Sequence, residues 1–298
     1  GHAVAMHLER HRADRDVRVQ DLSGQFGKMD VQGPMAARIM RDVLADPEQV
    51  FEAMPYFAFK GGFSETLPFC GRVATRDGVL LLLSRTGYTG EFGFEIFTSA
   101  ETIIGVWEAV MAAGANYGAI PCGLAARDSL RAGAVLPLSH QDIGDWPFCH
   151  HPWPFALPYR SGTDEFSKTF LGDAALQTDR GPYTYPFIGE NLRTVTLPAE
   201  VRDAADRVIG DVLTCVTDMA IGWHGDCVFS ITSPDAPEGF TGGGLCCGFV
   251  RVVDPLPLDT RITLKDKRRQ IEVRIVADIR PDRTARQPIH TMLQPKED

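Results

Sequence analysis

The segment SRTGYTGEFGFEIF, residues 84–97, contains a carboxylate in a sequence that otherwise has the composition of a buried strand. Alternate side chains of a strand face opposite sides, so Glu95 lies on the face opposite to Phe94 and Ile96. We expect Glu95 to face an enclosed space, where Gly93 would let a flat molecule approach the backbone. A buried carboxylate needs a partner, and the residues alone leave an internal arginine and the N–H groups of a ligand both open.

A second group of charges lies in CGLAARDSLRAGAVLPLSHQDI, residues 122–143. The spacing predicts a helix on which Arg127 and Arg131 share a face, while Asp128 can pair with Arg131 three residues further on. An arginine fork close to a carboxylate suits a flat ligand with a donor–acceptor edge or an acidic tail. Surface ion pairs on an ordinary helix are the alternative, and the spacing does not decide between the two.

Composition excludes several classes of protein. The chain has 298 residues, 44% of them hydrophobic and 23% charged, as in an ordinary globular protein. Its net charge is −9 with dispersed basic residues, which argues against a nucleic-acid or anionic-membrane partner. No run approaches the roughly 20 apolar residues that span a bilayer. The charged start, GHAVAMHLERHRADRD, is not typical of a signal peptide.

The cysteines favour a reduced, cytoplasmic protein. There are seven, scattered and without a C-x-x-C pair, whereas secreted frameworks use even and regular spacings. Cys149, His150 and His151 make a zinc site an alternative, but no second ligand pair lies at a usual spacing, so we expect no metal. The chain also contains no dinucleotide-binding fingerprint, P-loop, G-x-S-x-G or H-E-x-x-H motif.

Periodicity and turn signals predict an α+β chain. We expect an α+β region over residues 1–146, a proline-rich connecting segment over 147–184 and a C-terminal β domain over 185–298. The first region should contain two short strands within 17–33, a hairpin over 69–87 that turns at Asp77–Gly78, a strand over 92–99, and helices over 33–46, 99–114 and 121–138. The last region should form a small antiparallel barrel or sandwich from strands within 191–198, 211–218, 226–233, 245–253, 260–265 and 271–279.

Taken together, the chain resembles the aminomethyltransferase family, the T-protein of the glycine cleavage system and its folate-dependent relatives. The resemblance rests on five segments in this order: DLSGQFGKMDVQGPMAARIM, MPYF, SRTGYTGEFGFEIF, LAARDSLRAGAVLPLSHQDI and FLGDAAL. It covers nearly the whole chain, although the β-rich tail matches only in pattern. It implies a multi-domain arrangement around a folate cavity, with a C-terminal antiparallel β-barrel.

The resemblance also implies a tetrahydrofolate site. Glu95 corresponds to the family glutamate that accepts hydrogen bonds from the amino and ring N–H groups of the pterin. Tyr88 corresponds to a tyrosine of the site, and Arg127 to the arginine that faces the acidic tail of the folate or the carboxylates of the site. We leave Glu91, at the turn before the strand, outside the site as a solvated or capping residue.

The chain departs from the family pattern in three places. Members usually have a preceding segment that supplies an aspartate near the reacting folate nitrogen; this sequence begins after that point, so the catalytic residue is unknown. Gly133 stands where the family has a glutamate, and Ser139–His140 stand where it has Tyr-Gly. We expect His140 to be a loop residue rather than an acid–base group. These differences weaken the case for glycine cleavage itself.

We therefore predict a tetrahydrofolate-dependent one-carbon transferase, aminomethyltransferase-like or a demethylase. It would move a methyl or formaldehyde-level carbon from a small-molecule donor to tetrahydrofolate, and a partner subunit or a missing N-terminal segment would complete its site. The alternative is a non-catalytic folate-binding subunit or module of a larger amine-oxidising or demethylating complex. The KGCYxGQ motif of folate-binding relatives that support iron–sulfur enzymes is absent.

Overall fold

The computed structural model describes residues 2–64, 70–146, 157–178, 181–280 and 282–294. The chain divides into two compact units. Unit 1 comprises residues 1–87, 91–121 and 285–298, and unit 2 comprises residues 88–90 and 122–284. The domain boundaries expected after residues 146 and 184 stay a prediction.

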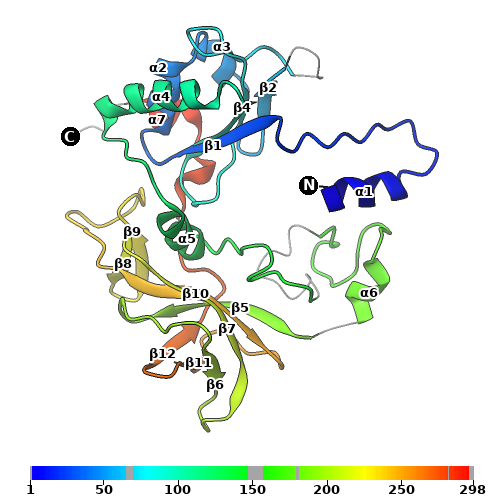
Figure 1. The fold of residues 1–298 in the computed structure, drawn as a ribbon. Coiled ribbons are helices and arrows are strands. Elements are labelled where there is room, and N and C mark those ends of the chain that lie inside the picture. Colours follow the sequence, from blue (N-terminus) through cyan, green and yellow to red (C-terminus); the bar gives the residue numbers. More distant parts are fainter. Residues whose placement is uncertain (1, 65–69, 147–156, 179–180, 281, 295–298) are drawn as a thin grey trace. The chain divides into compact units, whose positions relative to one another are not determined.

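Unit 1 is built on a four-stranded antiparallel sheet (Figure 1). Its strands, in the spatial order β1-β4-β3-β2, are β1 (Phe26–Gln32), β2 (Phe59–Gly61), β3 (Leu82–Ser84) and β4 (Gly93–Ser99). One face of the sheet is buried in the core, where Phe94 and Ile96 are fully buried as their alternation predicts. The other face is polar: Asp30 on β1 stands directly opposite Glu95 on β4, and Glu95 stands opposite Ser84 on β3.

Helices α2 and α4 cover the sheet of unit 1, and α7 packs against α2 (Figure 1). The helices of this unit are α1 (His2–His11), α2 (Ala36–Val43), α3 (Pro47–Phe51), α4 (Ile103–Gly114), the 3₁₀ turn η1 (Ala115–Tyr117) and α7 (Ile289–Leu293), with η4 (Thr284–Arg286) at the boundary of the unit. Ala37 and Met40 of α2 are fully buried in the same core as Phe94 and Ile96. The helix α4 ends at Gly114, as its sequence predicts.

Unit 2 contains a closed antiparallel barrel with the strand order β10-β5-β12-β11-β6-β7 (Figure 1). Its strands are β5 (Tyr183–Gly189), β6 (Glu200–Arg202), β7 (Val208–Asp218), β10 (Leu245–Val252), β11 (Arg261–Lys265) and β12 (Gln270–Ile275). A separate hairpin pairs β8 (Ile221–His224) with β9 (Cys227–Ser230), and the unit also has α5 (Leu124–Gly133) and α6 (Asp173–Thr178). The predicted α+β class with a C-terminal antiparallel barrel is confirmed.

Two strand predictions are wrong, and two strands of the barrel were not predicted. Residues 17–22 form no strand, and no residue of that stretch is buried, so an extended conformation there gains no packing. Residues 191–198 form no strand either, and the barrel uses β5 and β6 instead. The strand β5 contains Pro186, which cannot donate to a ladder and therefore argues against a strand at the sequence level.

Among the described residues, no helix has the length and apolar character needed to cross a membrane. The same part of the chain has no cluster of three or more histidine, cysteine or acidic side chains arranged to bind a metal ion. The zinc alternative at Cys149, His150 and His151 lies outside the described residues.

Candidate functional site

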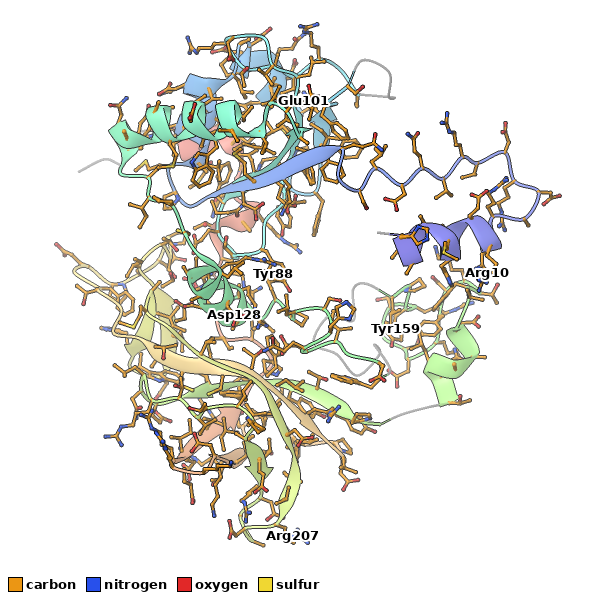
Figure 2. The ribbon with its side chains drawn as sticks, in the orientation of Figure 1. Arg10, Tyr88, Glu101, Asp128, Tyr159 and Arg207 are labelled. Carbon is orange, nitrogen blue, oxygen red and sulfur yellow. The ribbon has the colours of Figure 1, made fainter. Side chains whose placement is uncertain are left out.

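Unit 2 contains a pocket of about 340 Å³ beside α5. Tyr88 and Asp128, both labelled in Figure 2, line it. Arg127 and Arg131 also line the pocket, so the predicted helix brings both arginines to one place. The complete lining consists of Tyr88, Leu124, Ala125, Arg127, Asp128, Arg131, Leu138 and Gln141.

Tyr88 and Arg127 stack against each other in this pocket. The guanidinium carbon of Arg127 lies 5.3 Å from the centroid of the Tyr88 ring, within the range of a cation–π contact. The Tyr88 hydroxyl donates to the carbonyl of Pro137, which fixes the orientation of the ring. Burial raises the pKa of Tyr88, so the phenol is a neutral donor at neutral pH.

Arg127 is the accessible charge of the pocket. Its side chain is exposed, and it forms no ion pair with any described residue. The neighbouring Arg131 differs, because only 1% of it is exposed and its charge is neutralised within the chain. The pocket therefore offers a carboxylate or phosphate one cation, supported on an aromatic ring.

Arg131 anchors the wall of the pocket through a buried network. It pairs with Asp142, which is completely buried, and donates through Nη2 to Thr214 Oγ1 at 2.9 Å. The predicted pair with Asp128 is present at 2.6 Å from Nε. Asp142 also accepts from the Leu138 N–H at 2.9 Å and the Thr214 hydroxyl at 2.7 Å. Burial raises the pKa of Asp142, and the contacts with Arg131 oppose that rise.

Gly133 at the end of α5 has a packing role. A Cβ atom there would lie 2.1 Å from Asp218 Oδ2 on β7, so either the Asp218 side chain or the helix must shift to admit a side chain. The close approach accounts physically for a glycine where the family pattern has a glutamate. His140 follows in a turn with φ 67° and is exposed, as expected of a loop residue.

Glu95 in unit 1 already has partners within the chain. Its Oε1 lies 2.5 Å from Lys28 Nζ on the adjacent strand β1, and its Oε2 accepts from the Thr86 hydroxyl. Lys28 also lies 2.7 Å from Asp30 Oδ1, so one ammonium group bridges two carboxylates that face each other across the sheet. The partner of Glu95 is therefore a lysine, and 21% of the Glu95 side chain is exposed.

The carboxylates beside Lys28 raise the pKa of this lysine. Burial alone would lower the pKa of Lys28, but its hydrogen bonds to Asp30 and Glu95 outweigh burial and raise it. The ammonium group is thus charged at neutral pH and keeps both carboxylates in place. A patch of mixed charge remains on the polar face of the sheet.

Two expectations about this segment are wrong. The space beside Gly93 is filled by Gln32, whose Cδ would lie 2.5 Å from a Cβ at Gly93. Gln32 is fixed there by donating to the carbonyls of Thr86 and Phe94, each at 3.2 Å. Glu91 is buried at 8% exposure, so the expectation of a solvated residue is wrong, while the capping alternative stays a prediction.

The structure brings Tyr88 and Arg127 together, whereas Glu95 belongs to unit 1, so the convergence of all three stays a prediction. Sequence reasoning missed Lys28, Asp30 and Gln32, which line the polar face beside Glu95. The signal was present, because polar residues alternate with Met29 and Val31 along β1.

Comparisons with known proteins show which proteins the chain is similar to. Residues 1–146 match the GCVT N-terminal domain. The chain is 42% identical over 177 residues to an aminomethyltransferase of Bacillus pumilus (strain SAFR-032), covering 59% of this chain and 44% of that protein. It is 35% identical over 203 residues to an aminomethyltransferase of Symbiobacterium thermophilum, covering 65% of this chain and 48% of that protein. These matches confirm the predicted resemblance to the aminomethyltransferase family.

A solved structure shows the same fold. Glycine cleavage system aminomethyltransferase T from Bartonella henselae superposes with a TM-score of 0.64 at 20% identity, over 93% of this chain and 64% of that chain. The chain spans about half the length of the curated relatives that it matches. The T-protein-like fold is thus shown, while a folate cavity enclosed by its parts stays a prediction.

Proposed function

We propose that this chain binds tetrahydrofolate and acts in one-carbon transfer, moving a methyl or formaldehyde-level carbon from a small-molecule donor to a folate nitrogen. The observation that carries the proposal is the pocket of unit 2, in which the exposed Arg127 stacks on Tyr88. The resemblance to the aminomethyltransferase family supports the class of reaction.

Arg127 and Tyr88 suit the acidic tail of a folate. The tail carries carboxylates, and a planar guanidinium binds a carboxylate through two parallel hydrogen bonds. Among the described residues Arg127 forms no ion pair, so binding a tail breaks no existing pair. The buried contacts of Arg131 with Asp142 and Thr214 keep the supporting wall in one conformation.

Glu95 suits the pterin end. A carboxylate has about four acceptor sites, and Lys28 and Thr86 use two of them, so capacity remains for the amino and ring N–H groups of a pterin. Lys28 could then donate to an acceptor atom on the same edge of the ligand. In the transfer step, a bond forms between the folate nitrogen and the carbon, the bond from carbon to the donor heteroatom breaks, and the nitrogen loses a proton. The group that takes this proton is unknown.

Calorimetric titration of tetrahydrofolate into the chain, with the Arg127→Ala variant alongside, tests the proposal. Loss of a charge-assisted contact should weaken binding by about 10-fold or more. Arg207→Ala is the matched control, because Arg207 is an exposed arginine of the barrel that pairs with Asp203 and lines no candidate pocket (Figure 2). Absence of binding to the unaltered chain, or equal affinity in the Arg127 variant, would contradict the proposal.

Turnover separates the two functional classes. A chain that binds tetrahydrofolate and also forms methylated or methylene-bearing folate from an amine donor is a transferase. Binding without turnover, with or without added partner proteins, would favour the alternative of a folate-binding module within a larger amine-oxidising or demethylating complex.

A further inference from the structure

Unit 1 contains a second pocket, of about 400 Å³, which is formed without Tyr88, Glu95 or Arg127. It lies between the segment after α3 and the segment that includes α7, with Arg85 at its base. Its wall is largely apolar and includes Phe51, Met54, Pro288, Ile289 and Leu293. The volume is sufficient for a small organic molecule.

The charged residues around this pocket are all basic. Arg85, Arg286 and His290 line it, and none of the described residues that line it is acidic. Arg286 is exposed, and its guanidinium carbon lies 5.7 Å from the centroid of the Tyr56 ring. The pocket thus combines an apolar wall, an accessible guanidinium and an aromatic face.

Arg85 contributes a positive charge that the chain does not neutralise. Only 1% of it is exposed, and the nitrogens of its guanidinium donate to the carbonyls of Gly93 at 2.7 Å, Gln287 at 3.1 Å and Ala285 at 3.2 Å. Its guanidinium carbon lies 3.9 Å from the centroid of Phe92. Its Nε is buried and forms no hydrogen bond, and no described carboxylate pairs with it.

Burial lowers the pKa of Arg85 to about 10, so the group is still charged at neutral pH. Such a charge is unfavourable without a counter-ion, and its field is strong because the surroundings have a low dielectric constant. Arg131 in unit 2 is equally buried, but it has Asp142 as a partner. An anion in the adjacent pocket would be the counter-ion of Arg85, as Asp142 is the counter-ion of Arg131.

We propose that this pocket binds an aromatic carboxylate, whose carboxylate pairs with Arg286 above the charge of Arg85 and whose ring packs against Tyr56 and the apolar wall. The apolar wall favours a ligand with a flat hydrophobic body over a bare inorganic anion. A single accessible arginine fork matches the two oxygens of a carboxylate. This binding is independent of the proposed folate site.

Two isosteric probes test the charge requirement on the full chain. 2-Naphthoate and its neutral amide, 2-naphthamide, have nearly the same shape, so their affinities differ mainly through the carboxylate. We expect 2-naphthoate to bind and 2-naphthamide to bind at least about 10-fold more weakly. Calorimetry or protein NMR shifts measure both affinities. Equal affinities, or no binding of 2-naphthoate, would overturn the proposal.

Variants locate the binding. Arg286→Ala should weaken 2-naphthoate binding by about 10-fold or more, since it removes the accessible donor while Arg85 stays buried. Arg10→Ala, in the exposed helix α1, is the matched control and should bind as the unaltered chain does (Figure 2). Unchanged affinity of the Arg286 variant would overturn the assignment to this pocket.

Two further experiments distinguish binding in this pocket from non-specific anion binding and from binding at the proposed folate site. Inorganic phosphate at the same concentration should not displace 2-naphthoate; displacement would overturn the requirement for an aromatic body. Glu95→Gln and Arg127→Ala should leave 2-naphthoate affinity unchanged, because neither residue lines the pocket. A loss in either variant would overturn the independence of the two sites, whatever the result for tetrahydrofolate.

Discussion

The pocket wall of unit 2 and the polar sheet face of unit 1 both present candidate ligand-binding residues, but their charged side chains differ in burial and in pairing. In the wall, Arg131 and Asp142 are removed from solvent and neutralise each other, and Arg127 projects outside this pair. On the sheet face, Lys28 bridges Asp30 and Glu95 while all three side chains stay partly exposed. The wall is a rigid support for one accessible cation. The sheet face is a shared network, in which a ligand of Glu95 must fit beside Lys28.

We expect the largest loss of stability when the buried carboxylate of the pocket wall is removed. Asp142→Ala leaves the buried Arg131 without its main counter-charge and should lower the free energy of unfolding by about 3–5 kcal/mol. Glu95→Ala should lower it by about 1 kcal/mol or less, because its ion pair is partly exposed. Urea unfolding of both variants measures the contrast. Equal losses would show that the two regions do not differ as described.

Part of this contrast follows from sequence. The alternation of Phe94 and Ile96 with Glu95 predicts the strand and its two faces, and the three-residue spacing predicts the pair of Asp128 with Arg131. Asp142 could not be predicted as a partner, because it lies eleven residues from Arg131, beyond the end of α5 and outside any helical spacing.

Tertiary packing decided other features. Gln32 fills the space that Gly93 leaves, and Glu91 is buried, neither of which follows from local periodicity. The three-residue strand β6 is too short to show an alternation, although the closure of the barrel depends on it. The family resemblance predicted the barrel, whereas the strand pattern alone left a sandwich open.

A smaller effect is expected where α5 approaches the barrel. Gly133→Ala places a Cβ 2.1 Å from Asp218 Oδ2, so the buried Asp218 side chain or the helix must shift, at a cost of about 1–3 kcal/mol in the free energy of unfolding. Gly105→Ala is the control, since it lies in the exposed part of α4 with no atom within 4 Å of the new Cβ, and it should stabilise the chain slightly. Urea unfolding again gives the measurement. A Gly133 variant as stable as the unaltered chain would refute the close approach.

We expect the smallest change in stability from the pH dependence of Lys28 on the polar sheet face. The pKa of Lys28 is raised above 10.5 in the folded chain, so its stabilising contribution is complete below pH 10.5 and is lost as the pH rises through the folded value. The difference in unfolding free energy between the unaltered chain and Lys28→Met should therefore shrink above pH 10.5. Taking the difference cancels the titration of other lysines and tyrosines. A difference independent of pH would mean that Lys28 does not bridge the carboxylates in solution.

The central claim is that the pocket of unit 2 binds tetrahydrofolate through Arg127. Calorimetric titration of tetrahydrofolate into the unaltered chain, Arg127→Ala and the control Arg207→Ala tests it most directly. We predict one ligand per chain, with about 10-fold or greater weakening in Arg127→Ala and unchanged affinity in Arg207→Ala. If Arg127→Ala bound tetrahydrofolate as tightly as the unaltered chain, the account would be wrong.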